Sequence, residues 1–216
     1  MVWHNILARQ ARAGPPPCHH RGMDDVVAAV IARLTEAAAE HDARQADRLD
    51  RWRVLEPDAG RFLWLLAQTT GARSIVEIGT SRGVSTLWLA DAARATGGTV
   101  TTYDTDPAAQ DDARRTTAEA GLSWLVDFRG QDGGTALAAL PDGSVDLLFL
   151  DAERTEYPSW WPHPVRVLCD GGVLVADNAL SHPDEIAPVE ELLRADPALT
   201  VTTIAVGKGE LVALKR

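Results

Sequence analysis

A short apolar segment followed by a glycine-containing turn constrains the fold of this chain more than any other feature. Residues Ser74–Ile78 have the pattern of a buried strand, and Val84–Ala95 has that of a helix. The turn Gly79-Thr80-Ser81-Arg82-Gly83 joins them. Gly79 allows the backbone to turn tightly and to approach a ligand closely, and the first N–H groups of the following helix can hold an anionic group. The sequence therefore predicts a strand–turn–helix unit with a ligand site at its turn.

The same alternation of strand and helix patterns continues along the chain. The run Val145–Leu150 is almost wholly apolar, as a central parallel strand should be. Gly207-Lys208-Gly209 separates the last two strand patterns and indicates a hairpin. We therefore predict an α/β fold with a doubly wound, Rossmann-like sheet that is mostly parallel and has a C-terminal antiparallel hairpin. The seven expected strands are Ser74–Ile78, Thr99–Tyr103, Ser123–Phe128, Val145–Leu150, Val173–Ala176, Thr200–Val206 and Glu210–Leu214.

Helical patterns precede and connect these strands. Residues 24–48 are amphipathic, and a second helix is expected from about Asp58, whose side chain suits an N-cap. Residues Tyr157–Leu168 also have a helical pattern. We expect residues 1–22, which include a run of three prolines, to form a flexible extension. The rest, 23–216, is expected to be a single domain, with cap helices in 23–70 and the sheet core in 71–216.

Composition argues against several classes of partner. The formal net charge of −10 is the opposite of the clustered positive charge that sequence-independent nucleic-acid binding needs. No segment approaches the roughly 20 apolar residues of a membrane span, so we expect a cytoplasmic protein without a membrane partner. The two cysteines, Cys18 and Cys169, provide neither a disulfide framework nor metal-ligand spacing.

An acidic residue at the end of the second strand points to a nucleoside ligand. Asp104 lies 25 residues after Gly79, where a carboxylate can accept hydrogen bonds from both hydroxyls of a ribose. Asp106 precedes Pro107 and is better explained as the N-cap of the next helix. The turn does not match the dinucleotide fingerprint G-x-G-x-x-G, because Ser81 occupies its second glycine position, so a nicotinamide cofactor is disfavoured.

Oxygen-bearing side chains follow two later strands. Asp151 comes directly after Val145–Leu150, and Asp177-Asn178 come directly after Val173–Ala176. The carboxyl ends of parallel strands lie at one edge of the sheet, so these three side chains are expected close together. Hard oxygen ligands suit Mg²⁺, which keeps positions open for water and substrate. Each residue alone could equally cap a helix, but together they favour a divalent metal.

With these segments in view, the chain resembles the metal-dependent O-methyltransferases that include catechol O-methyltransferase and caffeoyl-CoA O-methyltransferase. The resemblance extends from about Leu55 to the C-terminus. The glycine turn alone marks the wider methyltransferase class, whereas the Asp-Asn pair after a Gly-Gly strand, joined to an earlier Asp, is more specific. The matching segments are residues 76–85, 99–107, 145–157 and 171–178.

The resemblance implies a role for several residues. It implies S-adenosylmethionine and magnesium or another divalent metal as cofactors, a small-molecule substrate and, because the family is often dimeric, a homodimer. The cofactor would be bound by Glu77, Gly79, Ser85, Asp104 and Gln131, with Asp151 at its border. The metal would be bound by Asp151, Asp177 and Asn178, and two substrate oxygens would complete its coordination.

The chain departs from the family at the general base. The family often has a lysine three residues after the first metal aspartate, and here this position is Arg154, which cannot be deprotonated. Arg154 could stabilise an oxyanion, clamp an acidic substrate group, or pair with Glu153 or Glu156 on the surface. His182 is a second candidate for proton transfer, although a histidine before a proline is more often a loop or cap residue. Arg154 and His182 are therefore the expected catalytic residues.

Two adjacent tryptophans are candidates for the substrate wall. Trp160 and Trp161 could flank a planar substrate, although at least one of them is expected in the core. Trp52, in the segment before Asp58, could cap the pocket, because the N-terminal helices of the family cover the substrate.

These patterns predict methyl transfer to a hydroxyl of a small molecule with vicinal oxygens, such as a catechol or a natural-product phenol. One alternative acceptor is a sugar or a hydroxy acid. A protein that binds the cofactor without chemistry of its own is another alternative, supported only by the missing lysine. A nicotinamide oxidoreductase is disfavoured by the glycine turn.

Overall fold

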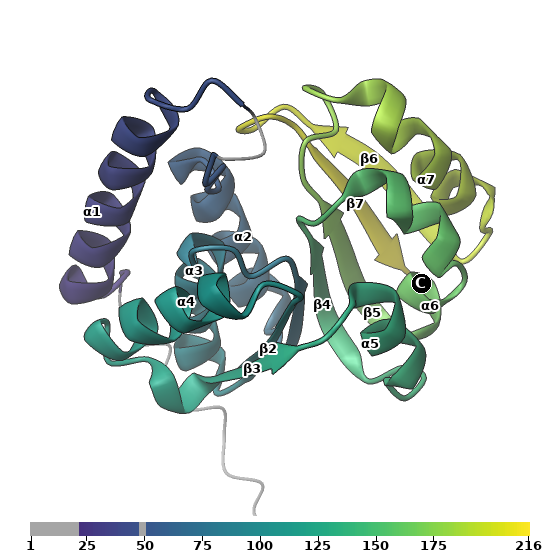
Figure 1. Ribbon diagram of the computed structural model, residues 1–216. Helices are drawn as coiled ribbons and strands as arrows, with labels where there is room; N and C mark the ends of the chain where they lie inside the picture. The colour runs from purple at the N-terminus through teal and green to yellow at the C-terminus, as the bar shows by residue number, and fades with distance from the viewer. Residues whose placement is uncertain (1–21, 48–50) are drawn as a thin grey trace, which may run out of the picture.

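The computed structural model describes residues 22–47 and 51–216, and the expected extension over 1–22 lies almost entirely outside them. A seven-stranded sheet with the order β3-β2-β1-β4-β5-β7-β6 forms the centre of the molecule (Figure 1). The strands β1 to β5 are parallel, and β7 pairs antiparallel with both β5 and β6. This confirms the predicted Rossmann-like sheet and hairpin. The strands are β1 Ser74–Ile78, β2 Thr99–Asp104, β3 Val126–Gly130, β4 Val145–Leu150, β5 Leu168–Ala176, β6 Leu199–Ile204 and β7 Glu210–Lys215.

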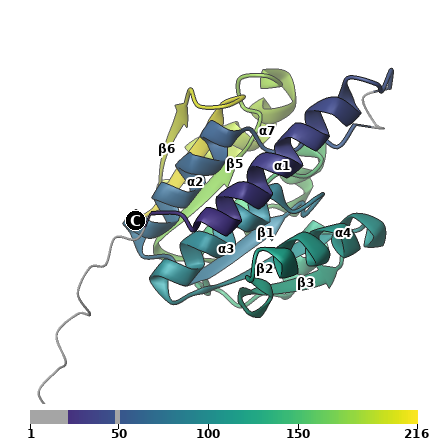
Figure 2. The ribbon, with the colours of Figure 1, turned by 90° about the vertical axis from the view of Figure 1, so that its left-hand side faces the viewer.

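Helices cover both faces of this sheet. On one face, α1 and α2 pack against α3, and α4 lies beside α3 over β2 and β3 (Figure 2). On the other face, α5 packs against β2, α6 against β5 and α7 against β6, and η3 lies between α5 and α7 (Figure 1). The helices are α1 Asp25–Asp42, α2 Pro57–Thr70, α3 Val84–Thr96, α4 Pro107–Glu119, η2 Ser123–Leu125, α5 Gly133–Ala139, η3 Arg154–Trp160, α6 His163–Arg166 and α7 Pro183–Ala195.

The central strand β4 is buried from both sides. Leu147 and Phe149 belong to the apolar cluster under α2 and α3, whereas Leu148 and Leu150 belong to the cluster under α5 and α7. Successive side chains of a strand point to opposite faces, so a strand covered on both faces must be apolar throughout. This is the physical reason why the run at 145–150 marks the middle of the sheet.

Several predicted boundaries were wrong. The first helix ends at Asp42 rather than residue 48, and the second begins at Pro57 with Glu56 as its N-cap. Proline at the first helical position has no N–H to leave unpaired, which explains why the helix starts before Asp58. The segment 123–125 is a 3-10 turn, so the third strand begins at Val126.

The segment predicted as one helix over Tyr157–Leu168 is two short helices, η3 and α6. Three prolines at 158, 162 and 164 remove the backbone donors that a continuous helix would need. Strand β5 then begins at Leu168 and includes Gly171-Gly172, which the sequence placed before the strand.

The order of strands fixes where a ligand can bind. After β3 the chain crosses to the other side of β1 and continues with β4, so β1 lies between β2 and β4. The connections leaving the carboxyl ends of β1 and β4 therefore diverge and leave a crevice between them.

Candidate functional site

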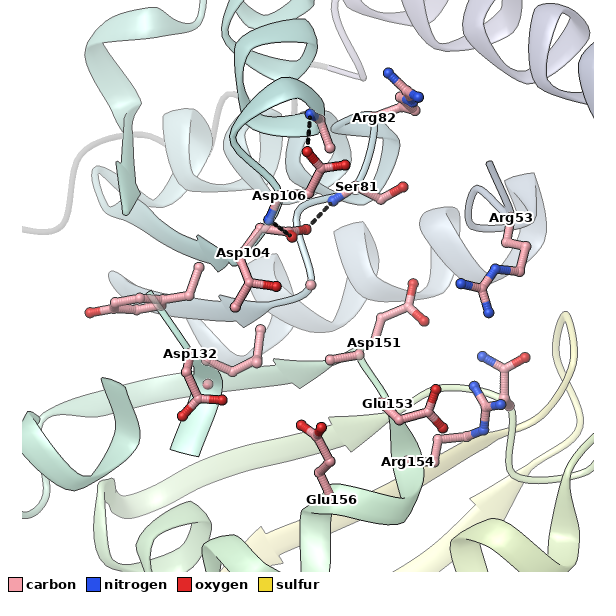
Figure 3. Close-up of a pocket in the computed structure, with 18 of the residues that line it drawn as sticks. Arg53, Ser81, Arg82, Asp104, Asp106, Asp132, Asp151, Glu153, Arg154 and Glu156 are labelled. Atoms are coloured by element: carbon pink, nitrogen blue, oxygen red, sulfur yellow. Dashed lines mark hydrogen bonds between the residues drawn. The ribbon is translucent and has the colours of Figure 1, made fainter. Parts of the chain in front are cut away.

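A cavity of about 520 Å³ lies at the carboxyl ends of the parallel strands. Residues that follow each of β1 to β5 line it, together with the α1–α2 connection and the β6–β7 hairpin (Figure 3). Its volume is within the range of small-molecule sites. The candidate site residues at the wall are Gly79, Asp104, Gln131, Asp151, Arg154, Trp160, Asn178 and His182.

Glycine is required where the turn after β1 meets the loop after β4. Gly79 has φ +106°, and a Cβ built on it would lie 2.2 Å from the carbonyl oxygen of Asp151. The Asp151 N–H in turn donates to the carbonyl of Ile78 at 2.9 Å. The backbone after β1 is therefore packed directly on the backbone that carries the first candidate metal ligand.

Asp104 organises the opposite end of the cavity. Its carboxylate accepts hydrogen bonds from the N–H groups of Ser81 at 2.8 Å and Asp106 at 2.9 Å (Figure 3). Asp106 itself caps α4 through the N–H groups at 108 and 109, as predicted. Gln131 lines the same end, and its N–H donates to the Asp104 carbonyl at 3.1 Å. The cavity end bounded by β1, β2 and β3 thus presents the residues expected to bind a nucleoside.

Glu77 and Ser85 lie behind the glycine turn and are absent from the described cavity wall. Glu77 is 0% exposed, and the hydroxyl of Thr86 donates to its Oε2 at 2.5 Å, while its Oε1 receives no hydrogen bond from a described residue. Burial raises the pKa of Glu77 to about 7, and hydrogen bonds from Ser85, Thr102 and Thr86 partly oppose this shift. A cationic group bound at the turn would favour the ionised form of this carboxyl.

The candidate metal ligands lie at the ends of the adjacent strands β4 and β5. The N–H of Asp177 donates to the Leu150 carbonyl at 3.1 Å, which holds the two strand ends together. Burial, followed by the neighbouring charges of Asp177 and Glu77, raises the pKa of Asp151 well above its ordinary value. Burial also raises the pKa of Asp177, against the hydrogen bond from the Asn178 N–H. The folding of the sheet therefore concentrates negative charge at this end.

These side chains fit a divalent metal in kind. Asp177 accepts from the backbone N–H of Asn178 at 2.6 Å and from its Nδ2 at 2.7 Å. Asn178 has φ +72°, a conformation that non-glycine residues adopt mainly at functional sites and turns. Among the described residues, its Oδ1 accepts a hydrogen bond from the Ser181 hydroxyl alone, at 3.2 Å, which leaves one lone pair for a cation. Among the described residues no three His, Cys, Asp or Glu side chains could hold a metal, and the set here is two carboxylates and an amide.

Arg154 is not on the surface. It is 6% exposed, and its Nε and a terminal nitrogen lie 2.8 and 2.6 Å from Oε2 of Glu185 on α7. The predicted alternative of a surface pair with Glu153 or Glu156 was therefore wrong, because the turn of η3 directs the guanidinium toward α7. Arg154 is a fixed positive charge at the wall of the cavity.

His182 also reaches the cavity, from the start of α7. Its N–H donates to the carbonyl of Asn178 at 2.9 Å, and its Nδ1 lies 2.9 Å from the hydroxyl of Ser181. The backbone of this candidate proton acceptor is therefore bonded to that of the candidate metal ligand Asn178.

The two tryptophans have different environments. Trp160 is 5% exposed yet borders the cavity, and its ring packs 5.0 Å from that of Tyr157. A Cβ on Gly134 would lie 2.5 Å from Trp160, so the glycines that open α5 make room for this ring. Trp161 instead packs against the apolar core and is outside the described wall.

Several residues at the site were missed by sequence reasoning. Lys208 on the hairpin pairs with Glu56 at 2.5 Å and lines the cavity. Glu210 is 0% exposed, and its carboxyl lies beside that of Asp177. The hydroxyl of Tyr157 accepts from the Ala152 N–H at 2.8 Å and fixes the loop after β4. A glutamate at the start of the otherwise apolar strand at 210–214 was the one available signal.

Comparisons with known proteins identify the family. The family model for O-methyltransferases matches residues 29–216. The chain belongs to this O-methyltransferase family. It is therefore an S-adenosylmethionine-dependent enzyme of class I, as the sequence resemblance predicted.

Relatives and solved structures agree with this assignment. A protein of Mycolicibacterium vanbaalenii that is named for O-methyltransferase activity is 34% identical over 224 residues, which cover 96% of this chain and 92% of that protein. The O-methyltransferase from Bacillus cereus in complex with S-adenosylhomocysteine is 27% identical, with a TM-score of 0.70 over 89% of this chain and 91% of that chain. TomG from Streptomyces achromogenes, solved with S-adenosylmethionine, is 28% identical, with a TM-score of 0.69 over 86% and 89% of the two chains.

The comparisons do not address the predictions on membrane partners, oligomeric state, location and domain division. In the part of the chain that the structure describes, no helix is long and apolar enough to span a membrane. The homodimer, the cytoplasmic location and the division into cap helices and core remain predictions.

Proposed function

We propose that this methyltransferase uses a divalent metal to methylate one of two vicinal oxygens on a small acceptor, such as a catechol or a related phenol. The observation that supports this most is the placement of Asp151, Asp177 and Asn178 at adjacent strand ends. Asp151 and Asn178 line the cavity, as Asp104 and Gln131 do, whereas Asp177 is buried beside them and outside the described wall. A cofactor bound between the two ends would direct its methyl group toward the metal ligands.

Each group at the cofactor end has a separate task. Asp104 would hold the ribose and Gln131 the adenine, while Gly79 leaves room for the methionine part. Glu77 would stabilise the positive charge of the cofactor from behind the turn. Asp151 would border both the cofactor and the metal.

At the acceptor end, Asp151, Asp177 and Asn178 would hold the metal. A divalent metal held there would supply Lewis-acid chemistry, which lowers the pKa of an acceptor hydroxyl. Methyl transfer would form a bond between the acceptor oxygen and the methyl carbon while the carbon–sulfur bond breaks, and would give a methyl ether, S-adenosylhomocysteine and the proton of the hydroxyl. Alignment of oxygen, carbon and sulfur supplies much of the rate in such transfers.

The proton of the acceptor hydroxyl must be accepted by a group other than Arg154. A guanidinium does not release its proton, and Arg154 is held by Glu185, so we assign it the stabilisation of the forming oxyanion. Lys208 is unsuited as a base, because its contact with Glu56 raises the pKa of its ammonium against the effect of burial. His182 lines the cavity and has an imidazole, a side chain that can accept a proton, so we assign it proton acceptance, directly or through water.

Metal removal tests the proposal. Purified protein is treated with a chelator, and methyl transfer from S-adenosylmethionine to catechol is measured before and after Mg²⁺ is restored. We expect activity to disappear and return, and Asp177→Asn to weaken Mg²⁺ binding in calorimetry, whereas the exposed Asp170→Asn should not. Full activity after complete chelation would overturn the metal role. A parallel screen of sugars and hydroxy acids, which carry similar oxygen pairs, would overturn the phenolic acceptor if only these were methylated.

A further inference from the structure

The connection between α1 and α2 carries residues into the cavity, and its backbone is fixed in place. The N–H groups of Trp52 and Arg53 donate to the two carboxylate oxygens of Asp42 at 2.7 and 3.1 Å. The Trp52 ring stacks on His41 with 4.4 Å between ring centroids. These contacts anchor residues 52 and 53 to the C-terminal end of α1.

The same connection is bound to the turn after β1. The hydroxyl of Ser81 donates to the carbonyl of Trp52 at 3.2 Å, and the guanidinium of Arg82 lies 4.8 Å from the Trp52 ring centroid. Trp52 is thus held between α1 and the turn expected to bind the cofactor. The backbone position of the neighbouring Arg53 is therefore fixed by contacts with both α1 and the turn after β1.

The conformation of Arg53 places its side chain at the acceptor end. Arg53 has φ +49°, in the left-handed region that a non-glycine residue occupies only when its surroundings hold it there. It lines the cavity, and Figure 3 shows its side chain pointing in toward the end that holds Asp151 and Arg154. The left-handed backbone therefore directs a long cation into the acceptor space.

Arg53 differs from the other lysine and arginine side chains at the cavity wall, because its guanidinium has no hydrogen-bond or ion-pair partner among the described residues. The other lysine and arginine side chains at the wall are neutralised by carboxylates, or, in one case, bound to a backbone carbonyl. Within residues 22–47 and 51–216, the guanidinium of Arg53 takes part in no hydrogen bond or ion pair. The pairs formed by these other cations are Arg82 with Asp112, Arg154 with Glu185, Lys208 with Glu56, and Arg51 with the backbone carbonyl of Gln45.

We propose that Arg53 selects acceptors that carry a carboxylate beside their two vicinal oxygens, so that the preferred substrate class is a small dihydroxylated aromatic acid. This inference rests on the proposed function. A guanidinium presents two parallel N–H donors that match a carboxylate, and it keeps its charge at all physiological pH values. The wall near Asp151 also carries Glu153 and Glu156, which would repel an anionic acceptor unless a cation offsets them. Arg53 supplies such a cation, because no other described residue binds its guanidinium.

The test compares two acceptors that differ only in the carboxylate. We measure kcat and KM of the full chain with saturating S-adenosylmethionine and Mg²⁺, using catechol and 3,4-dihydroxybenzoate. We expect the wild-type protein to prefer the acid, and Arg53→Gln to lower kcat/KM for the acid roughly 10- to 100-fold more than for catechol, mainly through KM. Arg53→Lys should retain part of the preference, because it keeps the charge and loses the paired donors.

A control and a binding measurement separate the possible failures. Arg44→Gln makes the same charge change on a side chain that pairs with Glu40 outside the cavity wall, and should leave the preference unchanged. Binding of 3,4-dihydroxybenzoate to the protein with S-adenosylhomocysteine and Mg²⁺ should weaken by a similar factor in Arg53→Gln. Methylation of catechol without preference for the acid, or equal losses for both acceptors, would overturn the role of Arg53 while the proposed function stands. Methylation of neither acceptor would overturn the proposed function itself.

Discussion

Glu210 on β7 lies directly across from Asp177, one step beyond the last paired residues of β5 and β7, Ala176 and Leu211. Residues opposite one another in an antiparallel pair share a face of the sheet, and like charges there repel. Burial, together with the charge of Asp177, raises the pKa of Glu210 to about 10. The ordinary strand pairing of the hairpin thus places a protonated carboxyl against a candidate metal ligand.

This pairing predicts a pH dependence of stability. In the metal-free protein, Glu210 keeps a proton that the unfolded chain releases once the pH exceeds its ordinary pKa of 4.5. The unfolded state therefore binds fewer protons, and the free energy of unfolding falls as pH rises from about 4.5 to about 10. Glu210→Gln removes this loss and should be more stable than the wild type by up to about 3 kcal/mol at pH 7, with a smaller gain at pH 5. Urea denaturation at pH 5, 7 and 9 measures this. A gain that does not grow with pH would contradict the assignment.

Arg154 is predicted to act on turnover rather than on cofactor binding. Its guanidinium is fixed by Glu185 at the cavity wall, and loss of a donor to a forming oxyanion costs on the order of 10²-fold in kcat. Arg154→Ala should therefore lower kcat by about this factor and leave the KM for S-adenosylmethionine nearly unchanged. Glu185→Gln, which leaves the positive charge in place, serves as the comparison and should have a much smaller effect. If both variants lose the same activity, Arg154 only supports the packing of η3 on α7.

Much of the candidate site could be predicted from the sequence, because the sheet topology alone brings most of its residues to one edge of the sheet. Asp104 ends a parallel strand, and Asp151, Asp177 and Asn178 each come after one. The carboxyl ends of such strands lie at the same edge of the sheet. Knowing that β4 is central was enough to place Asp151 at the crevice. No side-chain geometry was needed for this step.

The residues that sequence reasoning missed depend on packing between distant segments. Arg53 enters the cavity because Asp42 and Ser81, on two other elements, hold the backbone beside it. Glu210 reaches Asp177 through the register of the hairpin against β5, which local patterns do not specify. The surface partners suggested for Arg154, Glu153 and Glu156, were wrong for the same reason. Its actual partner, Glu185, is 31 residues away in the sequence.

Glu77 predicts that cofactor affinity depends on pH. Its pKa in the folded protein is about 7, and the sulfonium of S-adenosylmethionine would favour the ionised carboxylate. The affinity should therefore rise between pH 6 and 8 and then level off, with proton release on binding below pH 7. Calorimetry in buffers of different ionisation enthalpy measures both quantities. Glu77→Gln should flatten the profile, and S-adenosylhomocysteine, which lacks the sulfonium charge, should show a weaker dependence. An equally steep profile in the glutamine variant would assign the titration to another group.

Substitution of Gly79 is predicted to weaken ligand binding, whereas the same substitution at Gly71 is not. Both Gly79, at φ +106°, and Gly71, at φ +67°, have left-handed backbones, so alanine at either position costs roughly 1–2 kcal/mol in conformational strain. A Cβ at Gly71 meets nothing within 4 Å, whereas at Gly79 it lies 2.2 Å from the Asp151 carbonyl oxygen. Gly79→Ala must therefore displace the loop after β4, at a further cost of about 1–3 kcal/mol. That displacement moves a ligand of the proposed metal site as well as the cofactor turn. We expect Gly79→Ala to weaken the binding of S-adenosylmethionine and of Mg²⁺ together, as measured by calorimetry on folded protein, and Gly71→Ala to weaken neither. Loss of cofactor binding with unchanged Mg²⁺ affinity would mean that the two loops move independently.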